Sequence, residues 1–330
     1  MTGLRVGVLG AARIAPQAII KPAAGSPDAT VVAVAARDRG KAEAFAKKHQ
    51  IPHVHSSYAA LLADPEIDAV YNPLPNGLHG EWTIAALEAG KHVLCEKPFT
   101  ANAAEAREVK AVADAHPDLV VMEAFHYRYH PFAERLREIV ASGELGTVER
   151  VETAMCFPLI HRNDIRWDFA LAGGATMDVG CYTIHCLRLL AGEEPEVVAA
   201  TARLRKPDVD RAMVADMQFP SGATGRIHCS MWSSSVLKLG ARVIGDKGEM
   251  KVRNFTMPHV LGKLTVSTEA GSRSEVASKD RTYVRQLDAF CRAVGGDASA
   301  NLTPPSDSVT TMEIIDAVYT AAGLPLRPAG

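Results

Sequence analysis

The sequence lacks several features that define common classes of protein. Its six cysteines include no CxxC pair and are scattered through apolar segments, so we expect reduced thiols, no disulfide framework and no bound metal. No apolar run reaches the roughly 18 residues that a membrane-spanning helix needs. Arg5 and Arg13 interrupt any signal-like apolar region near the N-terminus. These absences predict a cytoplasmic protein without a membrane span.

The charge balance argues against a further class of partner. Lysine and arginine total 36 and aspartate and glutamate total 38, and no block of basic residues is present to follow a phosphate backbone. We therefore expect no nucleic-acid partner. A chain of 330 residues that is 47% hydrophobic can bury a large core, and its length favours two domains.

Up to about residue 123, short apolar strand-like segments alternate with helical patterns. Such alternation predicts a parallel sheet with helices on both faces, which is a doubly wound Rossmann domain. The expected strands cover residues 4–10, 30–36, 68–72, 92–96 and 119–124. We assign residues 1–125 to this dinucleotide-binding domain.

The pattern changes after residue 125. A predicted helix at 131–142 leads into segments that alternate at the strand period and are joined by tight turns, which is typical of an antiparallel sheet. These segments cover residues 148–157, 196–205, 212–219, 223–232, 239–245, 248–253 and 262–268. Two further helices are expected at 282–294 and 307–322. Residues 126–330 are thus predicted to form an α+β domain with a large, mainly antiparallel open sheet for substrate binding and oligomerisation.

The turn after the first strand is a candidate cofactor site, although it lacks a full GxGxxG motif. Gly10 can form the tight turn, and the small Ala12 and Ala15 allow a pyrophosphate to approach the backbone at a helix N-terminus. The residues expected to hold the pyrophosphate are Gly10, Ala11, Ala12, Arg13 and Ile14. Taken alone, the same residues fit simple packing of a helix on a strand.

The end of the second strand bears on the choice of cofactor. An NAD-binding domain places an acidic residue there, on the ribose 2′-hydroxyl, whereas this chain has Arg37, with Arg39 and Lys41 just beyond. A guanidinium can pair with a 2′-phosphate, so NADP is the preferred cofactor. Asp38 keeps NAD open as the alternative. Arg37 also fits a solvated surface charge.

Glu96-Lys97-Pro98 directly follows a predicted strand. This places an acid and an amine at the carboxyl edge of the parallel sheet, where ligands bind in open α/β folds. A lysine there can donate a hydrogen bond to a substrate hydroxyl and ease its deprotonation during hydride removal. An ion pair within the loop is the alternative interpretation of the tripeptide alone.

Further motifs recur in a recognisable order. The Gly10 turn, Pro73-Leu74-Pro75-Asn76 followed by His79, Glu96-Lys97-Pro98, MEAFHYRYHP at 122–131 and GGATMDVGCY at 173–182 resemble the glucose-fructose oxidoreductase, inositol dehydrogenase and MocA (Gfo/Idh/MocA) family. The resemblance covers essentially the whole chain and is closest to the branch of dimeric dihydrodiol and D-xylose dehydrogenases. It implies hydride transfer between NAD(P) and a carbinol or carbonyl carbon of a sugar, a sugar derivative or a cyclic trans-diol.

The resemblance also implies roles for individual residues. Lys97 would touch the nicotinamide ribose and the substrate, Glu96 would adjoin the cofactor, and Leu74 and His79 would lie along the ribose or nicotinamide. Many members carry DxGxH where this chain has Asp178 and, four residues on, a tyrosine in place of histidine. That tyrosine, Tyr182, is typical of the dihydrodiol and aldose branch.

Asp178 and Tyr182 lie four residues apart on a predicted helix, so they share one face. A nearby ammonium such as Lys97 would lower the pKa of the phenol toward neutral pH. We expect Tyr182 to exchange the hydroxyl proton with assistance from Lys97, and Asp178 to orient the substrate or the lysine. A tyrosine in the core of a buried helix is the alternative.

The segment 158–175 contributes Arg166 and Trp167, which fit substrate contacts and equally fit an ordinary polar connection. Because an exposed apolar sheet face would be a liability, we expect a homodimer or homotetramer through the C-terminal sheet.

Short-chain dehydrogenases need Tyr-xxx-Lys, and none of the seven tyrosines has a lysine four residues later. A non-catalytic NAD(P)-binding sensor of the same fold remains the alternative, although Lys97, Asp178 and Tyr182 together favour an enzyme.

Overall fold

The computed structural model describes residues 3–161, 163–235 and 237–329, and the chain divides into two compact units. Unit 1 contains Met1–Tyr129, Tyr283–Val309 and the last two residues, and unit 2 contains His130–Thr282 and Thr310–Pro328. The division at residue 125 gave each domain one continuous stretch, whereas in the structure each unit draws on separate parts of the chain.

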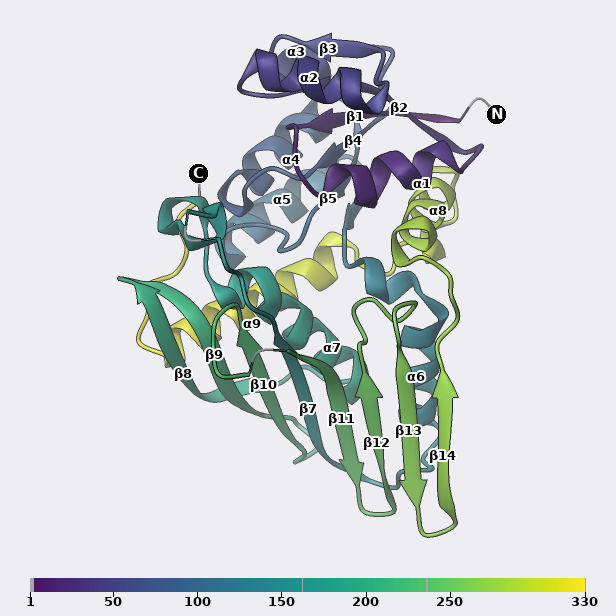
Figure 1. Ribbon diagram of the computed structural model, residues 1–330, viewed down its shortest axis with the longest axis vertical. Helices are drawn as coiled ribbons and strands as arrows, with labels where there is room; N and C mark the ends of the chain where they lie inside the picture. Colours follow the sequence, from purple (N-terminus) through teal and green to yellow (C-terminus); the bar gives the residue numbers. More distant parts are fainter. Residues whose placement is uncertain (1–2, 162, 236, 330) are drawn as a thin grey trace. The chain divides into compact units, whose positions relative to one another are not determined.

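Unit 1 is built on a six-stranded parallel sheet with the order β3-β2-β1-β4-β5-β6, which is the strand order of dinucleotide-binding Rossmann folds (Figure 1). The strands are β1 (Leu4–Leu9), β2 (Ala29–Ala35), β3 (His53–His55), β4 (Ala69–Asn72), β5 (His92–Cys95) and β6 (Val121–Glu123). The sequence predicted all of these strands except β3. The predicted Rossmann fold is therefore confirmed.

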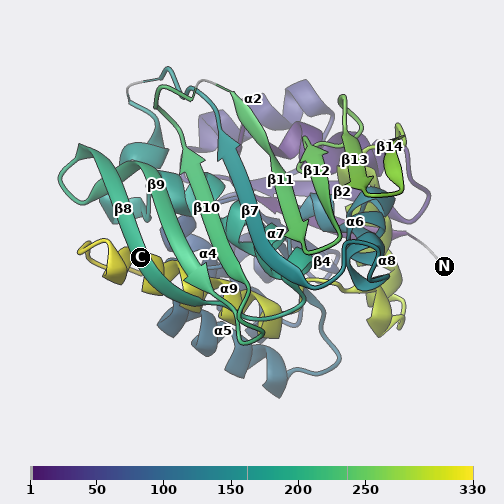
Figure 2. The same ribbon diagram turned by 90° about the horizontal axis from the view of Figure 1, so that it is seen from below.

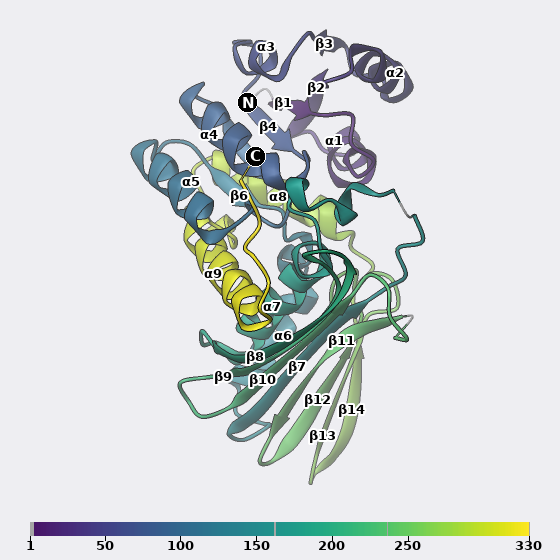
Figure 3. The ribbon, with the colours of Figure 1, turned by 90° about the vertical axis from the view of Figure 1, so that its left-hand side faces the viewer.

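Helices cover both faces of this sheet, with α4 and α5 on one side and α1 and α8 on the other (Figure 3). The helices are a π-helical turn at Pro16–Ile20 that continues into α1 (Lys21–Ala24), then α2 (Arg39–His49), α3 (Tyr58–Leu62), α4 (His79–Glu88), α5 (Ala103–Ala115) and α8 (Thr282–Val294). Asp38, Ser57 and Asn102 cap the starts of α2, α3 and α5 by accepting a backbone N–H. Leu287 and Phe290 of α8 join the same apolar core as Val8 of β1.

Unit 2 is built on an eight-stranded sheet with the order β14-β13-β12-β11-β7-β10-β9-β8. The strands are β7 (Val148–Cys156), β8 (Glu196–Lys206), β9 (Val209–Gln218), β10 (Thr224–Ser230), β11 (Lys238–Gly245), β12 (Gly248–Arg253), β13 (Lys263–Thr268) and β14 (Gly271–Val276). Only β7 and β10 pair in parallel. The expected mainly antiparallel sheet is confirmed, and β14 is a strand that the pattern did not predict.

One face of this sheet packs against α6 (Pro131–Ala141), α7 (Cys181–Ala191) and α9 (Pro305–Ala321). In Figure 2 the strands lie in front, with α6 and α7 behind them. The hydroxyl of Thr153 donates to the Thr183 carbonyl of α7, so the side chains next to Thr153 on β7 point to the opposite face.

On that outer face the strand register aligns Asp216, Arg226, Glu152 and Arg242 across β9, β10, β7 and β11. The outer face thus carries a row of alternating charges. It is not the continuous apolar surface on which the expected subunit contact was based, and the contact itself stays a prediction.

Candidate active site

The turn after β1 has the backbone conformation that a phosphate-binding turn requires. Gly10 has a φ of 96°, which favours glycine, and its N–H donates to the Ala35 carbonyl of β2 at 2.6 Å. A Cβ atom at Gly10 would lie 3.2 Å from the Leu74 side chain, so two of the predicted cofactor residues are neighbours. Residues 11–14 then lead into the helical turn that begins at Pro16, an end of a helix where the backbone dipole favours an anion.

At the end of β2 the structure separates the roles of Arg37 and Asp38. The Asp38 carboxylate accepts the Lys41 N–H at 3.0 Å and so caps α2. Arg37 is exposed and forms no ion pair with any of the described residues, while Arg39 pairs with Glu43 at 2.9 Å. One oxygen of the acid that kept NAD open thus has a structural contact, and the cation that favours NADP is exposed beside it.

The Glu96-Lys97-Pro98 segment directly follows β5 at the carboxyl edge of the sheet. Glu96 is buried, and its Oε1 accepts a hydrogen bond from the Tyr71 hydroxyl at 2.6 Å, while its N–H donates to the Asn72 carbonyl at 3.0 Å. Lys97 is half-buried and follows at once. Tyr71, which the sequence did not single out, therefore fixes the residue beside the predicted catalytic lysine.

His79 joins two of the loops at this edge. Its Nδ1 lies 2.7 Å from the Pro98 carbonyl oxygen and its Nε2 lies 2.8 Å from the Leu74 carbonyl oxygen. Burial lowers the pKa of this histidine to about 4, so the ring is neutral at pH 7. The neutral ring carries a single N–H, so it donates to one of these two carbonyls, while its other nitrogen packs against the second.

In unit 2, Asp178 and Tyr182 lie on one continuous helix that starts irregularly. Thr176–Gly180 forms a π-helical turn, in which the Cys181 N–H donates to the Thr176 carbonyl, and α7 begins at Cys181. Such wide turns occur frequently at functional sites. Tyr182 is 5% exposed in the first turn of α7.

The structure places Arg166 beside Asp178. Arg166 Nε lies 3.1 Å from Asp178 Oδ1, and its Nη1 lies 3.6 Å from the buried Asp164 carboxylate. Asp164 also accepts the Arg166 N–H at 3.1 Å, which starts a short 3-10 turn over Ile165–Trp167. The predicted substrate residue Arg166 and the predicted catalytic Asp178 are therefore direct partners.

Trp167 lies in the interior of unit 2. Its side chain is completely buried, its Nε1 donates to the His161 carbonyl at 3.1 Å, and the Arg205 guanidinium lies 4.8 Å above its ring. The indole therefore supports its neighbours, Arg166 and Arg205, and presents no exposed surface of its own.

A buried ion pair holds the start of the π-helical turn. Asp210 Oδ2 accepts both the N–H and the hydroxyl of Thr176 at 2.7 Å, and its Oδ1 accepts bonds from Tyr319 and Arg327 at 3.0 Å. Arg327 Nε also donates to the Gly173 carbonyl at 2.8 Å. The sequence alone did not indicate this cluster, for which the signal was a single arginine in the Pro-rich tail.

Position 174, beside this ion pair, requires a glycine. Its φ of 136° is accessible to glycine, and a Cβ atom there would lie 2.2 Å from Asp210 Oδ1. The paired glycines of GGATMDVGCY thus let the chain pass close to Asp210.

The described residues hold neither a metal-binding cluster nor a membrane-spanning helix. No cluster of three or more histidine, cysteine, aspartate or glutamate side chains is arranged to bind a metal ion. Across the same residues, every helix is too short or too polar to span a membrane.

Comparison with known proteins gives matches over both units. Residues 4–124 match the model of the Gfo/Idh/MocA oxidoreductase family with its NAD-binding Rossmann fold, and residues 133–251 match the model of the Gfo/Idh/MocA C-terminal domain. A D-xylose 1-dehydrogenase (NADP(+)) of Haloferax volcanii is 40% identical over 96% of each chain. A trans-1,2-dihydrobenzene-1,2-diol dehydrogenase of Mus musculus is 35% identical over 85% of this chain and 83% of the relative.

Solved structures agree with these matches. A 3-ketoreductase from Actinomadura kijaniata, in complex with NADP and TDP-benzene, superposes with a TM-score of 0.87 at 29% identity, covering 97% of this chain and 98% of the other. An aldose-aldose oxidoreductase from Caulobacter crescentus, complexed with glycerol, gives a TM-score of 0.88 at 25% identity with the same coverage.

Proposed function

This chain belongs to the Gfo/Idh/MocA family of oxidoreductases with an NAD-binding Rossmann fold, and on this premise we propose that it is a sugar or diol dehydrogenase. It transfers a hydride between NADP, or less readily NAD, and a carbinol or carbonyl carbon of a small polyhydroxylated substrate. The observation that carries this proposal is Lys97, placed directly after β5 at the carboxyl edge of a sheet in Rossmann order.

The residues of unit 1 fit a dinucleotide. Residues Gly10 to Ile14 hold the pyrophosphate at the start of a helix, and the exposed Arg37 guanidinium pairs with the 2′-phosphate. Leu74 lies along the cofactor next to Gly10, and His79 and Glu96 hold the adjoining loops in place. The preference for NADP is also supported by the NADP(+)-dependent relative from Haloferax volcanii.

Besides the hydride, the proposed reaction transfers one proton to or from the substrate oxygen. The nicotinamide ring, when bound, accepts or supplies the hydride. Lys97 donates a hydrogen bond to the substrate oxygen, and Tyr182 takes the hydroxyl proton during oxidation and returns it during reduction. Arg166 holds the Asp178 carboxylate, which orients the substrate. Arg166 contacts the substrate from the same side, while Trp167 supports it from the interior.

The test is a matrix of NADP and NAD against aldoses, sugar alcohols and cyclic trans-diols, followed through the absorbance of the reduced nicotinamide. For the pair that responds, we predict that Lys97→Ala and Tyr182→Phe each lower kcat by about 10²- to 10⁴-fold, because each removes a group that handles the proton. Cofactor affinity in the Tyr182→Phe variant should stay unchanged.

Matched controls are Lys47→Ala on α2 and Tyr58→Phe on α3, which lie outside the site and should keep full turnover. Wild-type turnover in the Tyr182→Phe variant would make Tyr182 a structural residue. Binding of NADP without turnover over the whole matrix would favour a sensor in place of an enzyme.

A further inference from the structure

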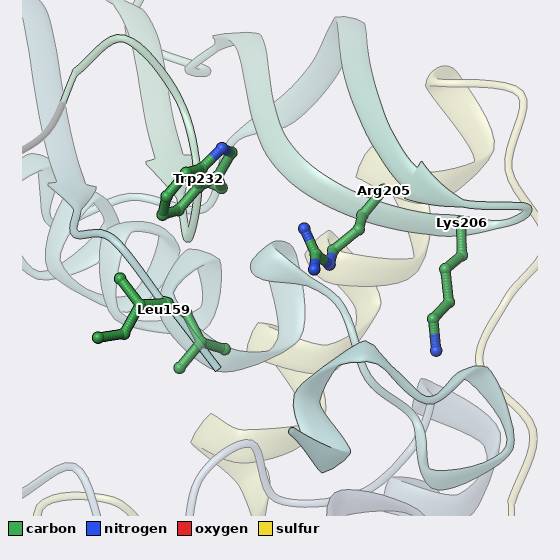
Figure 4. A pocket seen from close by; sticks show the side chains of 5 residues that line it. Leu159, Arg205, Lys206 and Trp232 are labelled. Carbon is green, nitrogen blue, oxygen red and sulfur yellow. The ribbon is translucent and has the colours of Figure 1, made fainter. Parts of the chain in front are cut away.

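A second feature of unit 2 is an open pocket whose lining residues have no role in the proton or hydride transfer proposed above. It has a volume of about 570 Å³ and is lined by Leu159, Ile160, Arg205, Lys206 and Trp232. Figure 4 shows Arg205 and Lys206 extending in different directions from the end of β8, with Trp232 and Leu159 on neighbouring segments. Small-molecule sites are typically about 300–1,000 Å³, so this pocket has the size of a ligand site.

The backbone around the pocket is well fixed. The Leu159 N–H donates to the Met231 carbonyl at 2.7 Å, which continues the pairing of β7 with β10 beyond the ends of both strands. The Trp232 carbonyl accepts a bond from Arg211 Nη1 at 2.7 Å. The apolar wall therefore extends from the sheet itself.

The two cations of the pocket lack acidic partners. Among the described residues, no carboxylate forms an ion pair with Arg205 or Lys206, although the chain as a whole carries more acidic than basic residues. Most other arginines of the sheet face are paired, as Arg226 is with Asp216. Two adjacent unpaired cations at one opening create a local positive potential that attracts an anion.

Arg205 is also held in position. Its guanidinium carbon lies 4.8 Å above the ring of the buried Trp167, a cation–π contact that holds the group beside the indole. Trp167 is the neighbour of Arg166, whose Nε contacts Asp178 at 3.1 Å. A single 3-10 turn therefore separates the pocket from the carboxylate assigned to the substrate.

The other wall of the pocket is apolar and exposed. Ile160 is 68% exposed and Trp232 is 45% exposed, so both leave apolar surface open to a ligand. A flat indole that faces a cavity can stack on the apolar face of a ring, and covering it recovers hydrophobic free energy. Cations on one side and an indole on the other fit a ligand that combines an anionic group with a ring.

We propose that this pocket binds the anionic arm of the substrate, a phosphate or a carboxylate attached to a sugar or diol. Arg205 and Lys206 bind the anionic oxygens, and Trp232 packs on the ring that carries them. This inference rests on the proposed function and makes it narrower, because it predicts that an acidic sugar is preferred over its neutral counterpart.

The kinetic test compares three forms of one sugar with the NADP-loaded protein: glucose, glucose 6-phosphate and glucuronate, or the same three forms of whichever aldose is turned over. At least one acidic form should show a lower KM than the neutral form. The double variant Arg205→Gln, Lys206→Gln should raise that KM by about tenfold or more, as expected for the loss of charged hydrogen bonds, and change the neutral KM by less than about twofold. The comparison of glucose 6-phosphate with glucuronate shows whether the pocket prefers a phosphate or a carboxylate.

The control is Lys47→Gln, Lys48→Gln on α2, which removes the same charge from an exposed surface of unit 1. Equal KM values for neutral and acidic forms, or equal effects of the two double variants, would overturn the proposal.

Calorimetric titration of glucose 6-phosphate and glucuronate separates this inference from the proposed function. Binding that the Arg205→Gln, Lys206→Gln variant abolishes, without turnover of any form, would retain the pocket and reject the dehydrogenase. Turnover of neutral sugars without any binding advantage for the acidic forms would retain the dehydrogenase and reject the anion-binding role of the pocket.

Discussion

At the scale of single residues, the neighbours Arg37 and Asp38 at the end of β2 have different roles. The Asp38 carboxylate caps α2 through one oxygen, Oδ1, and Arg37 is exposed beside it. The acid that a simple sequence rule would assign to NAD thus has a structural contact, and its neighbour is a cation with no ion pair among the described residues.

This division predicts the effect of Arg37→Ala. The variant should raise the KM for NADP by about tenfold or more, because a charged hydrogen bond contributes roughly 1.5–3 kcal/mol, and should leave the KM for NAD nearly unchanged. Initial rates with both cofactors measure the difference. The control is Arg39→Ala, whose guanidinium already pairs with Glu43. Equal changes for the two cofactors would place the 2′-phosphate elsewhere.

His79 predicts a dependence of stability on pH. Its pKa is about 4 in the folded protein and 6.5 when exposed, so the unfolded chain binds the extra proton first as the pH falls. The stabilising contribution is complete above pH 6.5 and decreases between pH 6.5 and about 4. By pH 5 the loss should be about 2 kcal/mol.

Urea unfolding of unit 1 at pH 7 and pH 5 measures this loss. The His79→Gln variant should lose less stability than the wild type over that range, and the exposed His53→Gln should behave as the wild type does. A wild type and His79→Gln variant with identical pH dependence would show that His79 does not carry the effect.

At the scale of elements, the turn that carries Asp178 depends on a contact far away in the sequence. Arg327 and Asp210 are both completely buried, and together they hold Gly173 and Thr176 at the start of the π-helical turn. The element that bears two of the proposed site residues is therefore positioned from the last segment of unit 2.

Arg327→Leu tests this dependence. The variant leaves Asp210 buried without its cation, which should destabilise unit 2 by about 3–5 kcal/mol. It should also lower kcat more than it changes the affinity for NADP, since NADP is assigned to unit 1. Thermal unfolding and initial rates measure both effects.

The control is Arg292→Leu, which breaks an exposed pair with Asp297 and should change stability very little, because exposed ion pairs contribute little. Similar losses in the two variants would mean that the buried pair is no more important than a surface one.

The elements also show what the sequence can and cannot predict. Strands with alternating or continuous apolar residues and helices with clear caps were predicted to within a few residues, as for α6 and α8. The pattern missed β3, which has three residues, and β14, whose residues are almost all exposed on an edge strand. Neither strand has an apolar period to detect.

Within the site, the motif residues were found, but their partners were not. The spacing of Asp178 and Tyr182 is the same in an α-helix and in a helix that begins with a π turn, so the π turn was not predictable. The pairing of Arg327 with Asp210 and the bond from Tyr71 to Glu96 join residues distant in the chain. Such contacts depend on the packed fold and leave no periodic signal in the sequence.

At the scale of the whole molecule, the order of the chain does not follow the order of the units. Unit 1 is interrupted by most of unit 2 and regains Tyr283–Val309 near the end. That returning segment supplies Leu287 and Phe290, each 1% exposed, to the core of unit 1. A Rossmann sheet made only from the N-terminal part would leave these core positions empty.

The fragment Met1–Tyr129 should therefore not fold as a stable unit. Each missing large apolar side chain contributes roughly 1.5–3 kcal/mol when buried, and a marginally stable domain loses most of its stability without α8. Circular dichroism during heating should show no cooperative transition, and a fusion of Tyr283–Val309 to this fragment should restore one. A fragment that unfolds as cooperatively as the fusion would contradict this.

The outer face of the sheet in unit 2 offers a different type of subunit contact from the apolar one expected. Its row of alternating charges at Asp216, Arg226, Glu152 and Arg242 can pair with the same row of a second copy related by a twofold axis. The predicted homodimer or homotetramer would then weaken as salt increases, because exposed ion pairs are screened.

The late return of the chain also has a consequence during synthesis. Asn301 and Thr303 donate to the carbonyls of Val121 and Glu123 on β6, the edge strand of the first sheet, across about 180 positions of sequence. During translation this strand edge is synthesised early, whereas Asn301 and Thr303 are added only when synthesis is nearly complete. An uncovered strand edge invites pairing with other chains. We therefore expect the nascent polypeptide to be most prone to such pairing before residues 301–303 are synthesised.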